Sequence, residues 1–160
     1  DAGTPLLSDP GFPLVRAARE AGLPVFAVPG ASALLAALAT AGLPTDSFAF
    51  FGFLPSKAGQ RAAALAGNKD SRETLVYYES PRRLGDTLAA MADAFGADRH
   101  AAVALELTKR FERLHRGSLG ELATEFAEAE TKGEAPTMSP AVITAWCGLR
   151  DLSWAMALAR

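Results

Sequence analysis

Short apolar runs of strand type alternate with helix-type segments along the chain, and this alternation limits the fold more than any other feature. Gly or Pro separates many of these segments. Strands are expected at 24–28, 48–53, 73–79, 100–108 and 141–146. Helices are expected at 10–21, 32–41, 56–66, 81–95 and 118–130, with weakly helical residues at 151–160. A chain that alternates in this way predicts an α/β fold.

Capping residues predict where individual helices begin and end. Asp9 is expected to cap the first helix, with Pro10 at its first position. Ser118 and Glu121 have the spacing of a capping box, which predicts a helix start at 118. Gly22 is expected to end the first helix.

The composition excludes several classes of protein. Apolar residues make up 49% and charged residues 21%, which is ordinary for a globular domain with a core. The formal net charge of −2 excludes a protein that coats nucleic acid nonspecifically, although a local basic patch stays open. The most apolar run, Ala31 to Leu43, has about half the length that a bilayer span needs, so no membrane partner is expected.

Cysteine and histidine are scarce. Cys147 is the only cysteine and the chain has 2 histidines, so neither an intrachain disulfide nor a zinc cluster is expected. No metal site is expected at all. A single thiol is consistent with the reducing cytoplasm, where we expect the protein to reside.

Two loops rich in Gly, Pro and small polar residues each lead into a helix. Asp1–Pro5 continues through Ser8–Gly11 into the first helix, and Val28–Ser32 joins a predicted strand to the second. Exposed backbone amides in such loops suit a small polar ligand, and ligands of open α/β sheets bind at the carboxyl ends of strands. Neither the dinucleotide-binding G-x-G-x-x-G motif nor a P-loop is present. An ordinary strand–helix connection is the alternative for both loops.

Polar residues also follow two later strands. Glu79–Arg83 follows one of them and Glu106–Lys109 follows the other. Their arginines and lysine, with those just downstream, would together form a basic face suited to RNA, and solvated surface charges are the alternative. The residues of this face are Arg82, Arg83, Lys109, Arg110, Arg113 and Arg116. His100 and His115 have no partner pattern and are expected to be structural.

Five phrases, taken together, are more specific than any single motif. They are Asp1-Ala-Gly-Thr-Pro-Leu-Leu-Ser-Asp-Pro-Gly11, Val28-Pro-Gly-Ala-Ser-Ala33, Gly52-Phe-Leu-Pro-Ser-Lys57, Tyr78-Glu-Ser-Pro-Arg-Arg-Leu84 and Glu106-Leu-Thr-Lys109. Over about residues 1–134 their order and spacing resemble the ribosomal RNA small-subunit methyltransferase I family. That family is the ribose-methylating branch of the tetrapyrrole-methylase superfamily.

The resemblance implies an activity and an architecture. The activity is 2′-O-methylation of a cytidine in small-subunit ribosomal RNA, with S-adenosylmethionine as methyl donor. The architecture is a tetrapyrrole-methylase-like α/β fold in a homodimer. Residues 1–45 would be the C-terminal part of a first α/β domain that binds the donor, and residues 46–160 a second α/β domain with a mixed sheet. The chain would then be N-terminally incomplete, and the resemblance ends near Glu134.

The resemblance also assigns roles to residues of this chain. Lys109 and Glu79 are the candidate catalytic bases for the ribose hydroxyl, because each follows a strand that is expected to end at the cleft. Lys109 would need its proton affinity lowered by burial or by a neighbouring cation such as Arg110, and an ion pair with Glu106 is the alternative. The expected RNA-binding residues are Lys57, Arg82, Arg83, Arg110 and Arg113. The expected donor-binding residues are Asp1, Ala2, Gly3, Thr4, Pro5, Pro29, Gly30, Ala31, Ser32, Tyr78, Leu107 and Thr108.

Three other functions remain open at this point. The chain could serve a methyltransferase that acts on a porphyrin or corrin ring. It could be a catalytically inactive fragment that dimerises or holds RNA. It could also be a plain nucleotide-binding module, which a preference for S-adenosylmethionine over ATP would exclude.

Overall fold

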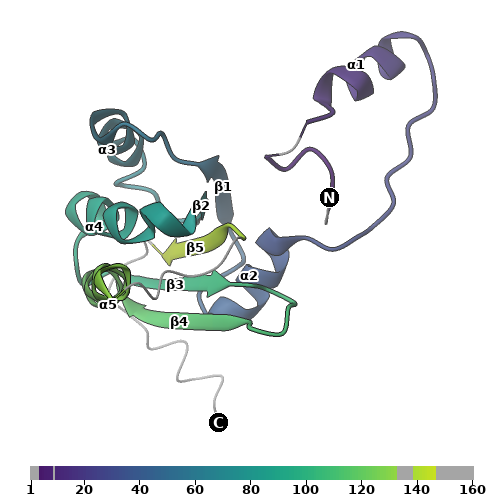
Figure 1. Ribbon diagram of the computed structural model, residues 1–160. Coiled ribbons are helices and arrows are strands. Elements are labelled where there is room, and N and C mark those ends of the chain that lie inside the picture. The colour runs from purple at the N-terminus through teal and green to yellow at the C-terminus, as the bar shows by residue number, and fades with distance from the viewer. Residues whose placement is uncertain (1–3, 9, 133–138, 147–160) are drawn as a thin grey trace.

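A five-stranded mixed sheet forms the centre of the computed structural model, which describes residues 4–8, 10–132 and 139–146 (Figure 1). The strands lie in the order β1-β2-β5-β3-β4; β1 and β2 are parallel, and the other neighbours are antiparallel. Their bounds are β1 Phe48–Phe53, β2 Thr74–Glu79, β3 His100–Leu105, β4 Arg113–Ser118 and β5 Ala141–Trp146. The expected α/β fold with a mixed sheet is therefore confirmed.

Three helices cover one face of this sheet. They are α3 (Ala58–Ala66), α4 (Leu84–Phe95), which follows the short 3₁₀ helix η1 (Pro81–Arg83), and α5 (Leu119–Thr131). Alternate residues of the central strands point into this layer, as the twofold period of a strand requires. The larger core cluster includes Leu75 and Tyr77 of β2, Leu88 and Met91 of α4, Val103 of β3, and Leu122 and Phe126 of α5.

Among the described elements, the apolar helix α2 (Ala33–Ala41) packs on the opposite face. Its residues Leu34, Ala37 and Leu38 contact Val76, Ala104 and Val142 of the sheet. As expected for residues 32–41, the side chain of Ser32 caps the start of the helix. The division expected after residue 45 falls between α2 and β1, and it stays a prediction.

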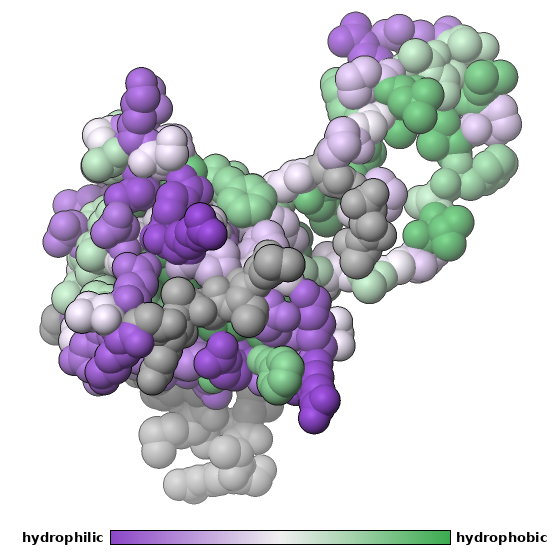
Figure 2. All heavy atoms as spheres, in the orientation of Figure 1, coloured by the Kyte–Doolittle hydropathy of each residue, from purple (hydrophilic) through white to green (hydrophobic). Residues whose placement is uncertain are grey.

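The N-terminal segment extends away from the sheet (Figure 1). Its helix α1 (Phe12–Glu20) has no buried residue, and hydrophobic side chains cover much of its surface in Figure 2. The strand expected at 24–28 is wrong, because no described strand lies beside this run to accept its hydrogen bonds. Phe26 and Val28 are accordingly 85% and 84% exposed.

The ends of some elements also differ from expectation. Gly11, not Asp9, is the N-cap of α1, and Asp9 itself lies outside the described residues. The strand expected at 100–108 ends at Leu105, because Glu106 and Thr108 take positive φ angles of 51° and 62° that no strand accommodates. The helical residues expected at 151–160 lie outside the described part of the chain.

One strand was not expected from the sequence. Strand β4 reads Arg-Leu-His-Arg-Gly-Ser, and it pairs antiparallel with β3 at the edge of the sheet. Because β4 is largely polar, a search for hydrophobic patterns does not detect it. Polar residues on an edge strand commonly prevent it from pairing with a strand of another molecule. None of the helices in the described part of the chain has the length and apolar character that crossing a bilayer requires.

Candidate functional site

The ends of three strands meet at one edge of the sheet. Strands β2 and β3 are both antiparallel to β5 and so run in the same direction as each other and as β1. The segments that follow Phe53, Glu79 and Leu105 therefore leave the sheet at the same edge. These segments contain the Gly-Phe-Leu-Pro, Glu-Ser-Pro-Arg and Glu-Leu-Thr-Lys phrases, so the fold gathers motifs that are far apart in the sequence.

The two N-terminal loops contact one another at this edge. The Thr4 backbone N–H donates to the Ala31 carbonyl oxygen at 2.7 Å, and the Thr4 hydroxyl donates to the same oxygen at 3.1 Å. Ser8 lies against β1, since a Cβ on Gly52 would be only 2.7 Å from its Oγ. Of the residues expected in the first loop, Asp1, Ala2 and Gly3 lie outside the described residues.

The second loop leads directly into α2. Pro29, Gly30 and Ala31 are exposed, and a side chain at Gly30 would meet only the Val28 carbonyl oxygen, at 4.0 Å. The backbone of this loop is thus open to a ligand. The next residue, Ser32, is already engaged, because its Oγ accepts the Leu35 N–H at 3.5 Å.

Tyr78 links the sheet to the start of α2. Its phenol hydrogen-bonds the backbone of Leu34, and its ring is partly buried. Burial raises the pKa of the Tyr78 phenol above its usual 10.0, and the hydrogen bond to Leu34 opposes this only in part. The phenol therefore stays neutral at physiological pH and can donate a hydrogen bond.

Two phenylalanine rings of β1 pack against Tyr78. The ring of Phe50 lies edge-on to it with centroids 4.8 Å apart, and the ring of Phe53 does so at 5.7 Å. Leu107 packs against the same α2 cluster, so its expected place near Tyr78 agrees with the geometry. Sequence reasoning missed Phe50 and Phe53 as site residues. They are three positions apart, so a strict two-residue period predicts opposite faces for them, and the register shift between Phe50 and Gly52 lets both rings contact Tyr78.

Glu79 points to the other face of the sheet, away from Tyr78. Its side chain is 0% exposed, and its two oxygens accept hydrogen bonds from three donors. These are the Ser80 N–H at 2.6 Å, an Arg83 guanidinium nitrogen at 2.5 Å and the Thr87 hydroxyl at 2.8 Å. Each contact ties the end of β2 to the start of η1 and α4. The structure therefore does not bring Glu79 together with the loops around Thr4 and Ala31.

Lys109 lies on a tight turn after β3. Its Nζ is 3.3 Å from Glu106 Oε2, it donates to the Ser139 hydroxyl, and its side chain is 53% exposed. The turn is held by the Lys109 N–H on the Glu106 carbonyl at 2.9 Å and by the Thr108 N–H on Glu112 Oε2 at 2.6 Å. Glu112 is a contributor that the sequence analysis missed, and its carboxylate stabilises the positive φ of Thr108.

The expected RNA-binding residues all follow strand ends at this edge. Lys57 follows β1, Arg82 and Arg83 follow β2, and Arg110 and Arg113 follow β3. Arg83 is paired with Glu79, whereas among the described residues no ion pair engages the other four. Arg116, by contrast, reaches the C-terminus of α2 and donates to the Gly42 carbonyl at 3.4 Å.

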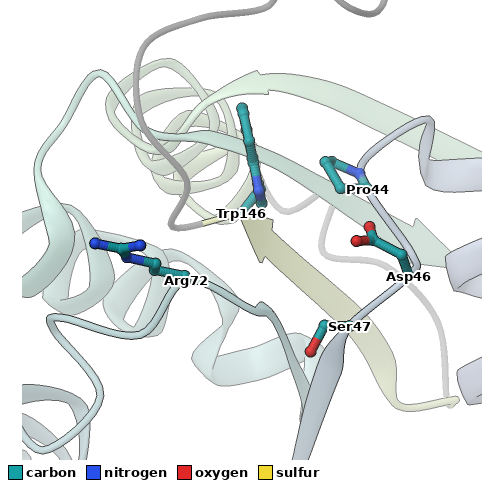
Figure 3. A pocket seen from close by; sticks show the side chains of 5 residues that line it. All are labelled: Pro44, Asp46, Ser47, Arg72 and Trp146. Carbon is teal, nitrogen blue, oxygen red and sulfur yellow. The ribbon is translucent and has the colours of Figure 1, made fainter.

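A separate hollow lies at the opposite edge of the sheet (Figure 3). Its volume is about 520 Å³, and its lining residues are Pro44, Asp46, Ser47, Arg72 and Trp146. Because β1 and β2 begin at this edge and β5 ends there, the hollow is remote from the motif residues. Within the described residues, no group of three or more His, Cys, Asp or Glu side chains could hold a metal ion.

Comparison with known proteins identifies sequence relatives. Residues 1–123 match the family described as tetrapyrrole (corrin/porphyrin) methylases. The ribosomal RNA small subunit methyltransferase I of Mesorhizobium japonicum is 53% identical over 84% of this chain and 46% of its own length. The protein of that name from Pseudomonas aeruginosa is 52% identical, over 76% of this chain and 43% of its own length. The chain spans about half the length of the curated relatives it matches.

Solved structures share the fold at lower identity. The structure of the methyltransferase CobJ aligns with a TM-score of 0.63 and 18% identity over 95% of this chain and 65% of its own. That of uroporphyrin-III C-methyltransferase from Thermus thermophilus complexed with S-adenosylhomocysteine has a TM-score of 0.57 and 21% identity, over 90% of this chain and 62% of its own. At these identities the likeness shows the fold alone.

Proposed function

Because the chain belongs to the family of tetrapyrrole (corrin/porphyrin) methylases, we propose that it serves the S-adenosylmethionine-dependent 2′-O-methylation of a cytidine in small-subunit (16S) ribosomal RNA. The observation that supports the proposal is the sequence identity of 53% and 52% between this chain and two proteins named ribosomal RNA small subunit methyltransferase I. That likeness extends over the motifs that converge at one edge of the sheet.

The residues at this edge fit the methyl donor. A nucleoside with an amino acid tail needs both backbone hydrogen-bonding groups and an apolar wall. The open backbone of Pro29–Ala31 offers the first, and Phe50, Tyr78 and Leu107 offer the second. We assign the donor to these residues together with Thr4. When bound, S-adenosylmethionine supplies a methyl group activated by the positive sulfur.

The protein's own contribution is alignment and proton removal. Alignment of the two reactants removes the entropy cost of a bimolecular encounter. It needs binding loops that hold their positions, and the hydrogen bonds between Thr4 and Ala31 fix the two N-terminal loops to each other. A ribose hydroxyl is a weak nucleophile, so a base that takes its proton accelerates attack by about 10²- to 10⁴-fold. Between the two candidate bases, Lys109 is the accessible one, because Glu79 is buried and three donors already engage its carboxylate. The ion pair of Lys109 with Glu106 would have to open before Lys109 could take the proton.

The partners follow from the same proposal. The substrate is small-subunit ribosomal RNA or the ribosomal subunit, and Lys57, Arg82, Arg110 and Arg113 would contact its phosphates. The proposed assembly is a homodimer in the cytoplasm. A methyltransferase of porphyrin or corrin rings is the main competing function, since solved structures of such enzymes share this fold.

Calorimetric titration with S-adenosylhomocysteine tests the donor site. We expect Thr4→Val to weaken binding about fivefold, because the lost hydrogen bond to Ala31 contributes about 1 kcal/mol to the frame. Thr124→Val is the matched control, since the hydroxyl of Thr124 bonds only its own helix at Gly120. The full-length Mesorhizobium japonicum relative, titrated in parallel, reports whether residues outside this chain are needed. Failure of both proteins to bind would refute the methyltransferase proposal.

Methyl transfer from tritium-labelled S-adenosylmethionine then distinguishes the substrates. Label incorporated into 16S ribosomal RNA, but not into uroporphyrinogen, supports the ribose-methylating function. The reverse pattern would assign the chain to the tetrapyrrole-modifying enzymes. Donor binding without transfer to either substrate would favour a chain that holds donor or RNA without catalysis.

A further inference from the structure

The N-terminus of helix α3 has an unusual electrostatic character. Its N-cap is Lys57, no side chain caps its free amides, and no acidic residue lies in its first turn. The positive end of a helix normally attracts carboxylates and repels cations. Nothing lies within 4 Å of a Cβ built at Gly59 in this first turn, so this stretch of backbone is open to a ligand.

A second cation lies one turn further along α3. Arg61 is only 7% exposed, and its Nε is buried without a hydrogen-bond partner among the described residues. Its backbone N–H donates to the Lys57 carbonyl at 2.9 Å, which fixes it one turn after Lys57. Long helical side chains lean toward the helix N-terminus, and this tendency directs the Arg61 side chain toward the turn that begins at Lys57.

No described carboxylate compensates for these charges. The ion pairs of the described residues engage neither Lys57 nor Arg61. The buried carboxylate of Glu79, at the end of the neighbouring strand β2, already has three donors on its oxygens. A buried guanidinium nitrogen, a lysine and free helix amides thus share one end of α3 without an anion.

We propose that the N-terminus of α3 is a phosphate-binding site that takes a backbone phosphodiester of RNA. The amides of Ala58, Gly59 and Gln60 are the groups that bind the phosphate oxygens, in the way helix N-termini bind anions. Lys57 and the Arg61 guanidinium neutralise its charge.

The position of the site favours RNA over a free anion. Four residues separate the end of β1 from the start of α3, which lies at the edge where the donor loops meet and where the exposed Arg82 also lies. A phosphate held here would be part of a strand that passes the donor site. This assignment of the source rests on the proposed function, whereas the affinity for phosphate rests on the geometry of α3 alone.

Nuclear magnetic resonance of the isotope-labelled 160-residue chain tests the site. Inorganic phosphate and a short single-stranded RNA are titrated separately while the amide signals of Ala58, Gly59 and Gln60 are followed. We expect both ligands to shift these signals. Arg61→Gln and Lys57→Gln should each reduce the shifts, and Arg61→Lys, which keeps the charge, should restore part of them.

The salt dependence of RNA binding provides the second measurement. Loss of one phosphate contact should reduce the slope of log K against log salt concentration by about 0.7 for single-stranded RNA. Arg61→Gln should show this reduction, and Arg72→Gln, an exposed arginine at the opposite edge of the sheet, should not. Lys57→Gln is the second test variant in case the Arg61 variants do not fold. Lys57 is exposed, so its replacement leaves the core intact.

Each outcome bears on the proposal. Shifts with both ligands and a reduced slope for the variants support a site for RNA phosphate. Shifts with inorganic phosphate alone overturn RNA as the source, and signals unmoved by either ligand overturn the site itself. Neither failure touches the proposed methyltransferase function, which is measured separately by S-adenosylhomocysteine binding and methyl transfer.

Discussion

Replacement of the buried carboxylate of Glu79 should reveal what this side chain does. It is 0% exposed and accepts from Ser80, Arg83 and Thr87. In Glu79→Ala all three donors lose their acceptor, and the loss of one partner from a buried ion pair costs about 3–5 kcal/mol. Domains of this size have a total stability of roughly 5–15 kcal/mol, so the variant should lose between about a fifth and nearly all of its stability.

Glu79→Gln should be much milder, for a reason that the geometry gives. The remaining amide oxygen can accept from Ser80 and Arg83, which both bond Oε1, and the new amide nitrogen can donate to the Thr87 hydroxyl on the other side. These hydrogen bonds lose only the strengthening that the carboxylate charge gives them, so we expect the free energy of unfolding to fall by about 1–2 kcal/mol. The free energies of unfolding are to be measured by urea denaturation, with unchanged m-values as the check on two-state behaviour.

Two results would contradict this reasoning. A Glu79→Ala variant within about 1 kcal/mol of the original chain would mean that the three contacts contribute little to stability. A Glu79→Gln variant of normal stability that loses methyl transfer would restore Glu79 as the candidate base. Thr87→Val completes a double-mutant cycle, and coupling of about 1 kcal/mol or more with Glu79→Gln is expected if the buried bond at 2.8 Å contributes to stability.

Two further predictions concern helix ends. Gly42→Ala and Gly22→Ala should each destabilise by about 1–2 kcal/mol, because both glycines have positive φ angles, 64° and 70°, and the new Cβ at Gly42 would meet only the flexible end of the Arg116 side chain; a difference of more than about 1 kcal/mol between them in chemical denaturation would contradict this. Ser118→Ala should cost about 1 kcal/mol through loss of the capping box. The Ser118 hydrogen bonds lower the pKa of Glu121 below its usual 4.5, so their contribution is present above pH 4.5 and is lost as the pH falls through the lowered pKa. Denaturation curves of Glu121→Gln should lack this acid-dependent loss, and an unchanged pH profile would refute it.

Most helices and strands could be predicted from the sequence because their signals are local. The aromatic run at β1, the apolar run at β5 and the capping box of α5 each predicted an element that the structure contains. Two predictions about strands failed for a shared reason. Residues 24–28 have strand composition but no described neighbour, whereas the polar β4 has a neighbour in β3. Pairing, which no local pattern contains, decided both.

The candidate site was predictable only in outline. Ligands of α/β sheets bind where parallel strands end, so the motifs after β1, β2 and β3 could be expected to meet at one edge. The sequence could not show, however, that two adjacent residues of one motif have different roles. Tyr78 and Glu79 are adjacent in the sequence, yet the first hydrogen-bonds the start of α2 and the second holds α4.

The sequence by itself determined the alternation of elements, the caps of α2 and α5 and the family, because these depend on local residue order and on motif spacing. The tertiary structure alone decided which face each strand residue occupies and which loops touch. It joined Thr4 to Ala31, engaged Glu79 with three donors and left Arg61 Nε without an acceptor among the described residues. The physical reason is that hydrogen bonds and burial arise between residues distant along the chain, and these distances are fixed only when the sheet and its helices pack.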